Sequence, residues 1–148
     1  MSAPDRSDCI FCKIVRQEAP SSIVHMDDST MSFMDIRPIN EGHVLVIPKR
    51  HAASLAELPP DLGAKVFRQA MAVAAGLRRS AIRCEAVNLH LADGEAAGQE
   101  IDHVHIHVIP RYEGDGFGFR VGPGYGRIPD RVELDAAAEK IQAAMSRQ

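Results

Sequence analysis

The sequence predicts an α+β fold with a largely antiparallel sheet of about five strands in one domain. Three observations support this class. Short apolar or alternating segments typical of strands occur through most of the chain. One long amphipathic helix is expected in the middle and another at the end, so strands and helices do not alternate as in a parallel sheet. The length of 148 residues, with 45% hydrophobic and 25% charged residues, suits one domain with a sizeable core.

The expected strands are bounded by turn residues. The first two are separated by Asp-Asp-Ser, which favours a turn. The third begins at a glycine and runs apolar to a proline, as a well-buried strand does. The last two show alternation of side-chain types. The predicted strands are residues 23–26, 30–36, 42–49, 86–91 and 103–110.

Three helical segments are expected. Residues 9–17 fit a short helix or turn, and Pro59 and Pro60 suit the first turn of the central helix, where a missing N–H costs nothing. Asp130 and Glu133 form a plausible capping box for the final helix, which begins at about residue 131. The central apolar stripe is Leu62, Val66, Phe67, Ala70, Met71, Ala74 and Leu77, and the final one is Leu134, Ala137, Ala138, Ile141 and Met145.

The remaining segments complete the expected organisation. Residues 1–8 are expected to form a flexible tail, residues 9–148 the single domain, and residues 113–126 an irregular glycine-rich loop. The formal net charge of −3 gives no basic surface for nucleic acid or anionic lipid. The polar N-terminus has no apolar signal segment, so a cytoplasmic protein is expected.

A run of alternating histidines, His103-Val-His105-Ile-His107, is the most unusual feature. Side chains two apart on a strand share a face, so the three imidazoles should lie together and the valine and isoleucine should face the core. Three readings remain open: an exposed polar face, a catalytic metal site, or nucleophilic catalysis. In the last, a neutral imidazole attacks phosphorus while its neighbours donate hydrogen bonds to the charged oxygens.

The run resembles the signature of the histidine triad (HIT) family, in particular its Hint-like branch. CIFCKIV, FMDIRPINEGHVLVIPKRH and AAGQEIDHVHIHVIPR extend the resemblance over about residues 9–111. It implies an antiparallel sheet with a long helix, dimerising into a larger sheet with one site per subunit. It also implies hydrolysis or transfer at the α-phosphate of a nucleotide. The middle histidine, His105, would be the nucleophile, and His107 and His43 would bind phosphoryl oxygens.

The same resemblance implies a nucleotide pocket. Asp35 would accept hydrogen bonds from the ribose, and loop amides around residues 98–100 would contact phosphate. Asn88, a polar residue in an apolar strand, is included among the candidates. The apolar residues could equally be core. The nucleotide-binding set is Phe11, Ile14, Phe33, Asp35, Ile36, Leu45, Asn88, Gly98, Gln99, Glu100, His105 and His107.

Cys9, Cys12, His51 and His103 form a possible zinc set. A lone Cys-x-x-C is weak evidence, and both cysteines could be packed residues in a reducing compartment. Two further ligands would close a tetrahedral structural site, and the resemblance to zinc-carrying members supports this.

Two positions depart from the family pattern. Ala92 stands where many members carry Asn or Gln, and Glu100 stands where a serine assists the leaving group in one subgroup. A carboxylate there could protonate an amine or repel a polyphosphate, and it could equally be an ordinary loop residue. Arg120 and Arg127, in and after the glycine-rich loop, could touch phosphate, although a solvated loop is the more usual reading.

The function expected from this sequence is hydrolysis of a purine nucleoside 5′-phosphoramidate by a homodimeric enzyme with structural zinc and no organic cofactor. Three alternatives remain: a dinucleoside polyphosphate hydrolase, a nucleotide-binding module for protein contacts with little turnover, and a metal-dependent hydrolase that uses the triad as ligands.

Overall fold

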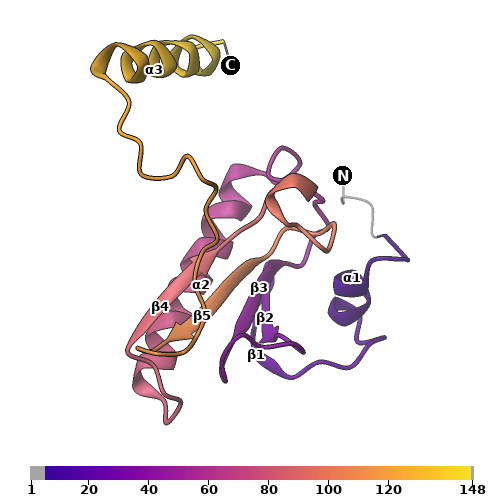
Figure 1. Ribbon diagram of the computed structural model, residues 1–148. Helices are drawn as coiled ribbons and strands as arrows, with labels where there is room; N and C mark the ends of the chain where they lie inside the picture. The colour runs from indigo at the N-terminus through magenta and orange to yellow at the C-terminus, as the bar shows by residue number, and fades with distance from the viewer. Residues whose placement is uncertain (1–5, 148) are drawn as a thin grey trace. The chain divides into compact units, whose positions relative to one another are not determined.

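The computed structural model describes residues 6–147, which form two compact units, residues 6–116 and 117–147. The first unit holds the sheet, and the second holds the glycine-rich segment's end and the last helix (Figure 1). Residues 1–5 of the expected tail lie outside the described residues, and the boundaries of a single domain stay a prediction. The elements of the first unit are α1 (Ile10–Val15), β1 (Ile23–Met26), β2 (Thr30–Met34), β3 (Val44–Pro48), α2 (Pro60–Arg79), β4 (Ala86–His90), the 3-10 helix η1 (Glu95–Ala97) and β5 (Ile106–Arg111).

The five strands form one sheet in the order β1-β2-β3-β5-β4, and every neighbouring pair is antiparallel. The predicted fold class and strand number are therefore confirmed. The triad strand β5 lies between β3 and β4, so its residues have neighbours on both sides. Leu45 pairs with His107 on one side, and His90 pairs with His107 on the other.

The two faces of the sheet pack against different helices. Val44 and Val46 of β3, with Ile106 and Val108 of β5, join the buried face of α2 in one hydrophobic cluster. The alternate residues of β2 and β3 pack with Phe11 and Ile14 of α1 in a second cluster, whose strand members are Met31, Phe33, Leu45 and Ile47. His107 pairs with Leu45 and therefore lies on the α1 side, where the rings of His103 and His105 also contact Phe11.

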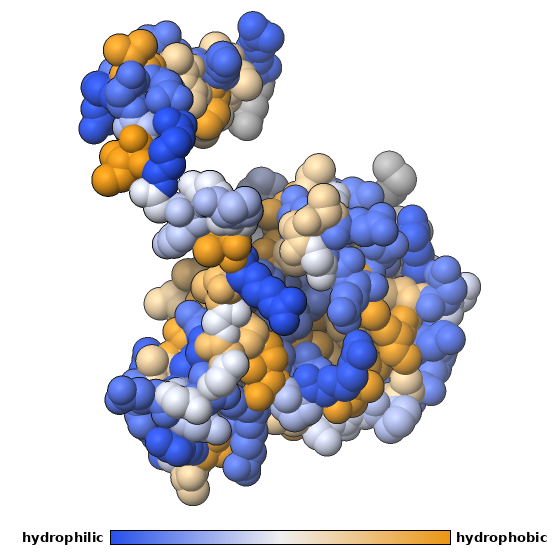
Figure 2. Space-filling view, in the orientation of Figure 1, coloured by the Kyte–Doolittle hydropathy of each residue, from blue (hydrophilic) through white to orange (hydrophobic). Residues whose placement is uncertain are grey.

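Helix α2 begins as expected from its prolines, with Pro59 at the N-cap and Pro60 as its first residue. Its predicted apolar stripe is partly wrong. Phe67 and Met71 are 51% and 57% exposed, while Val73, absent from the predicted stripe, is buried. The core face therefore follows Val66, Ala70, Val73, Ala74 and Leu77. Other apolar side chains are exposed as well, and apolar and hydrophilic residues are interspersed over the visible face (Figure 2).

Several strands are shorter than predicted, two of them for a local reason. Strand β2 ends at Met34 because Asp35 Oδ1 accepts the backbone N–H of Arg37 and turns the chain. Strand β3 begins only after Gly42, whose φ of +92° suits glycine. Strand β4 ends at His90, one residue earlier than predicted.

The predicted strand over residues 103–110 is also wrong at its start, because β5 begins at Ile106. The backbone N–H groups of His103 and Val104 donate to the carbonyls of Ile101 and Ala52 at 2.8 Å, outside the sheet ladder. Only His107 of the three triad residues therefore lies on the strand. Val104, Ile106 and Val108 are buried as predicted.

The second unit contains α3 (Arg131–Met145). The predicted capping box is confirmed: Asp130 Oδ1 accepts the N–H of Glu133 at 2.9 Å, and the Glu133 carboxylate accepts the N–H of Asp130 at 3.3 Å. None of the helices within residues 6–147 is both long and apolar enough to cross a membrane.

Candidate active site

The candidate site lies where the start of β5 meets β3 and α1. His105 is 5% exposed, and its ring centre lies 5.0 Å from that of His107 and 5.3 Å from that of Phe11. His43, at the residue just before β3, lies 5.1 Å from His107 between ring centres. The three residues proposed for catalysis are therefore brought together.

The tautomer of His105 is set by the backbone. Its Nδ1 lies 2.7 Å from the carbonyl oxygen of His103, and a carbonyl can only accept, so Nδ1 carries the proton. In a neutral ring, Nε2 then holds a free lone pair. Burial lowers the pKa of His105, against a smaller raising effect of that same hydrogen bond. The lowered pKa favours the neutral ring at pH 7, in which Nε2 can act as a nucleophile.

A hydrogen-bonded chain sets the tautomers of His43 and His107. The backbone N–H of Ile39 donates to His43 Nδ1 at 3.1 Å, so the proton of a neutral His43 lies on Nε2. That Nε2 donates to His107 Nδ1 at 2.9 Å. The proton of neutral His107 is consequently on its Nε2, which makes this atom a donor for an anionic oxygen.

Both rings are neutral for the same physical reason. Burial lowers the pKa of His43, and burial with the nearby His105 and His43 rings lowers the pKa of His107 to about 4. Asp35 Oδ2 lies 3.5 Å from His43 Nε2 and 3.9 Å from His107 Nδ1, and its charge opposes these shifts without overcoming them.

Asp35, His43 and His107 also lie close enough together to hold a metal ion. The tautomer of His43 argues against metal binding by these three residues. A metal on His43 Nε2 would require the ring proton on Nδ1, where it would face the N–H of Ile39. The geometry therefore disfavours the alternative in which the catalytic histidines are metal ligands.

The apolar residues predicted for the base pocket lie mostly on one side of the triad. Phe11 packs edge-on against Phe33, at 5.4 Å between ring centres, and also against His103 and His105. Ile14 and Leu45 are buried in the same cluster. Ile36, by contrast, is 91% exposed and belongs to no buried cluster of the described residues, so its side chain is free to cover a ligand.

The loop before the triad uses its polar groups internally. Gln99 accepts the N–H of Gly94 and donates to the carbonyls of Ala53 and Ile101. The N–H groups of Gly98 and Gln99 donate to carbonyls of the η1 turn at 2.9 and 3.1 Å. These contacts order the loop that leads into His103, and anion binding by its amides stays a prediction.

Two other predicted residues have partners away from the triad. Glu100 is exposed and pairs with Arg37 at 3.1 Å. This ion pair links the turn after Asp35 to the loop before His103. Asn88 Oδ1 accepts a hydrogen bond from Arg111. A nucleotide contact of Asn88 stays a prediction.

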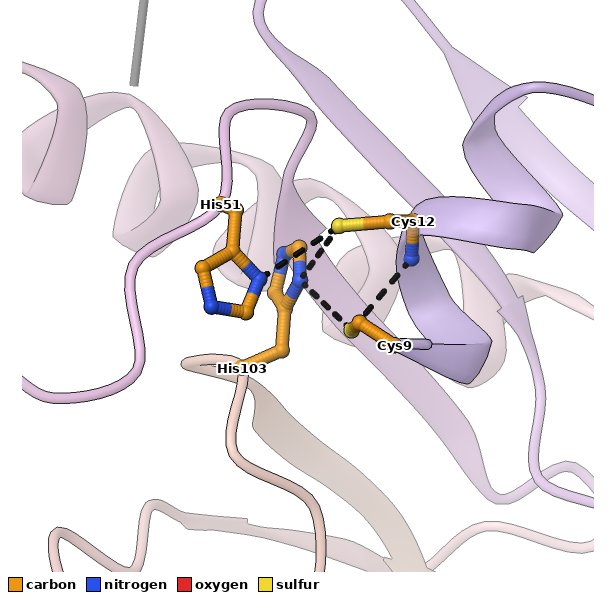
Figure 3. Close-up of side chains that lie close together, drawn as sticks. All are labelled: Cys9, Cys12, His51 and His103. Atoms are coloured by element: carbon orange, nitrogen blue, oxygen red, sulfur yellow. Dashed lines mark hydrogen bonds between the residues drawn. The ribbon is translucent and has the colours of Figure 1, made fainter. Parts of the chain in front are cut away.

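The predicted zinc residues converge from three separate parts of the chain (Figure 3). Cys9 caps α1 and Cys12 lies within it, His51 follows β3, and His103 precedes β5. Their ligand atoms all lie within 4.8 Å of one another, and three of the four residues are buried. His103 Nε2 donates to the carbonyl of Pro48 at 2.8 Å, so its bare Nδ1 faces the sulfurs.

The distances within this cluster fit a tetrahedral zinc. Arms of about 2.3 Å to sulfur and 2.0–2.1 Å to nitrogen separate neighbouring sulfur and nitrogen ligands by roughly 3.6 Å. Cys9 Sγ lies 3.5 Å from His103 Nδ1, and Cys12 Sγ lies 3.4 Å from His51 Nδ1 and 3.7 Å from His103 Nδ1. The residues therefore fit a structural zinc, which would tie α1 to the strand ends.

One residue at the site was missed by the sequence reasoning. His90 pairs with His107 across β4 and β5, with 5.7 Å between ring centres, and its charge lowers the pKa values of His105 and His107 when it is protonated. The alternation in residues 86–91 places His90 on the same face as Asn88, but strand order was needed to bring it beside His107.

Comparison with known proteins agrees with this geometry. The HIT domain model matches residues 16–114. The adenosine 5′-monophosphoramidase of Saccharomyces cerevisiae is 41% identical over 113 residues, which cover 75% of this chain and 68% of that protein.

Two solved structures are similar over nearly the whole chain. One is SMU.412c from Streptococcus mutans, with a TM-score of 0.87, 34% identity and coverage of 95% of this chain and 87% of that one. The other is a zinc-bound histidine triad protein from Mycobacterium smegmatis, with a TM-score of 0.73, 37% identity and coverage of 93% and 97%. These matches agree with the histidine run and with the sheet that carries it. The chain therefore belongs to the HIT domain family.

Proposed function

We propose that this protein hydrolyses or transfers a nucleotide at its α-phosphate through a nucleotidyl intermediate on His105. The observation that carries the proposal is the hydrogen bond from His105 Nδ1 to the His103 carbonyl, which leaves a lone pair on Nε2 of a neutral ring. A neutral nucleophile is not repelled by an anionic phosphate, as a carboxylate would be.

The chemistry divides into two displacements. In the first, His105 Nε2 attacks phosphorus and a P–N bond forms, while the bond to the leaving group breaks with its electron pair on that group. The leaving nitrogen of a phosphoramidate takes a proton from solvent and departs as ammonia. In the second, water attacks phosphorus and gives its proton to solvent, and the P–N bond breaks with its electron pair on Nε2, which restores neutral His105. His107 Nε2–H donates to the phosphoryl oxygens in both steps, held in that tautomer by His43.

The nucleoside would occupy the α1 side of the triad. Phe11, Phe33 and Leu45 offer an apolar wall for a purine, and Ile36 would cover the other face of the base. Asp35 Oδ1 holds the turn through Arg37, and its Oδ2 would accept the ribose hydroxyls.

The favoured substrate is a purine nucleoside 5′-phosphoramidate. The monophosphoramidase activity that names the yeast relative supports this choice. Incubation with adenosine 5′-phosphoramidate should release AMP, and protein with His105→Ala should not. Release of AMP by that variant at the rate of the native protein would refute the mechanism.

Two alternative functions are separated by the same assay. A dinucleoside polyphosphate hydrolase would turn over diadenosine polyphosphates faster than the phosphoramidate. A nucleotide-binding module for protein contacts would bind AMP tightly without turnover.

Structural zinc and a homodimer complete the proposal. Zinc bound by Cys9, Cys12, His51 and His103 would stabilise the fold and would not take part in the reaction. Two copies would join their sheets into a larger one, and light scattering of the purified protein tests whether it is a dimer.

A further inference from the structure

A buried polar network lies behind the catalytic histidines, at the turn between β2 and β3. Asn40, 8% exposed, uses both N–H bonds of its amide: one donates to the carbonyl of Pro110 at 2.9 Å and one to Asp115 Oδ2 at 2.8 Å. The turn is thereby attached to the end of β5. None of these contacts belongs to the proposed nucleotide site.

The carboxylate of Asp115 is itself firmly held. Its side chain is 3% exposed, and Arg111 donates to it through two nitrogens, at 2.6 and 2.8 Å. The backbone N–H of Tyr112 donates to the same group at 3.3 Å. A two-pronged pair of this kind has a fixed geometry, so Asp115 offers Asn40 an acceptor in one place.

Asn40 in turn closes the turn that carries His43. Its carbonyl accepts the N–H of His43 at 3.1 Å, while the preceding residue, Ile39, donates its N–H to His43 Nδ1 at 3.1 Å. The opposite side of the turn is packed too, because a Cβ added to Gly42 would lie 3.0 Å from Ile82. The position of the Ile39 N–H therefore depends on Asn40.

We propose that Asn40 and Asp115 are positioning residues, which fix the tautomers of His43 and His107 by holding the Ile39 N–H against His43 Nδ1. If the turn relaxes, His43 can carry its proton on Nδ1 and accept from His107 instead. His107 would then present a bare Nε2 to a phosphoryl oxygen, and its contribution to catalysis would be lost. This consequence rests on the proposed function, whereas the tautomers themselves do not.

The test measures tautomers directly in the full-length protein. Protonated and bare imidazole nitrogens resonate in separate ranges, so ¹⁵N-histidine labelling with long-range ¹H–¹⁵N spectra assigns each ring. In the native protein, His43 and His107 should both be protonated at Nε2. A proton on Nδ1 of either ring would overturn the proposal without any variant.

Two variants then test the network from its two ends. Asp115→Asn keeps the shape of the side chain and removes its charge, and Asn40→Ala removes the amide. Each should populate the second tautomer of His107 and lower kcat about 10-fold or more, with KM changed less than about twofold. Folded Asp115→Asn protein with native tautomers and native kcat would overturn the proposal.

Asp27→Asn is a matched control. Asp27 orders the β1–β2 turn by accepting the N–H groups of Ser29 and Thr30 at 2.8 Å, so its loss perturbs a turn of the same sheet outside the network. This variant should keep the native tautomers and kcat. If the native protein releases no AMP, the proposed function fails while a tautomer change in Asp115→Asn still supports the positioning role.

Discussion

Nδ1 of His105 donates to the backbone carbonyl of His103 at 2.7 Å, so one residue of the histidine run sets the tautomer of the next. The side chain of His103 meanwhile points to the two cysteines, with its Nε2 on the Pro48 carbonyl. The backbone of His103 thus serves the proposed reaction and its side chain serves the proposed zinc site. The alternating run thus contributes residues to both candidate sites.

Removal of the nucleophile should abolish turnover and leave the fold intact. His105→Ala is expected to lower kcat by about 10³-fold or more, because the adjacent rings of His43 and His107 carry their protons on Nε2 and have no lone pair there for attack. Steady-state release of AMP measures this loss. His25→Ala is the matched control, since His25 is an exposed residue of β1, and a similar loss in that variant would contradict the assignment.

Loss of His43, which donates a hydrogen bond to His107, should lower kcat more than it changes KM. His43→Ala removes the donor to His107 Nδ1 and lets His107 change tautomer, so a decrease of about 10²-fold in kcat is expected. The split between kcat and KM is measured on the phosphoramidate. A rise in KM with native kcat would mean that His43 only binds the ground state.

The pH profile follows from the lowered pKa of His107. Because burial lowers that pKa to about 4, the ring stays neutral in the folded protein from pH 8 down to about pH 5. We therefore expect kcat/KM to be flat between pH 8 and 6 and to fall toward pH 4. A decrease centred on the ordinary histidine value of about 6.5 would contradict the assignment.

The free energy of unfolding should decrease as the pH falls, because folding lowers the pKa of His107. His107 binds a proton more readily when unfolded, so its contribution to folding is complete above about pH 6.5 and is lost as the pH falls toward 4. Denaturant unfolding across this window should give a lower free energy of unfolding at acid pH. His107→Gln should reduce that slope.

Zinc should be present at one ion per chain and should stabilise the fold. Cys12→Ser removes a buried ligand and should lower both the zinc content and the Tm. Each kcal/mol lost corresponds to about 2–4 °C in a domain near this size. Cys84→Ser is the control, because Cys84 lies outside the cluster; equal effects of the two variants would count against the site.

Asp35 tests the ribose contact. Asp35→Asn keeps an oxygen for the N–H of Arg37 but loses the negative charge, so it should raise KM about 10-fold for a ribonucleotide. For a substrate without the 2′ and 3′ hydroxyls, the KM of the variant should differ much less from the KM of the native protein. The same change in KM for both substrates would exclude the contact.

Much of the fold was predictable because it follows from local patterns. Proline at the start of α2, the capping box at Asp130 and the apolar strand after Gly42 each act through neighbours in sequence. Two other errors come from contacts between distant segments. Strand β5 begins late because Val104 bonds to Ala52, and Phe67 is exposed because the sheet covers another side of α2.

The same distinction holds for the site. The run of histidines and the resemblance it carries predicted roles for His43, His105 and the zinc residues, and the fold brings these residues into two clusters. His90 and the Asn40–Asp115 contact could not be predicted, since each depends on which strands become neighbours. The tautomers of His43 and His105 could not be predicted from the sequence either, because each depends on the position of a single backbone group.

The central claim is that Nε2 of His105 becomes bonded to phosphorus during turnover. The most direct measurement mixes the protein with adenosine 5′-phosphoramidate, quenches it within a turnover at alkaline pH and maps the adenylylated peptide by mass spectrometry. We predict an AMP adduct on His105, absent after His105→Ala. Turnover with no adduct, or an adduct on another residue, would contradict the mechanism.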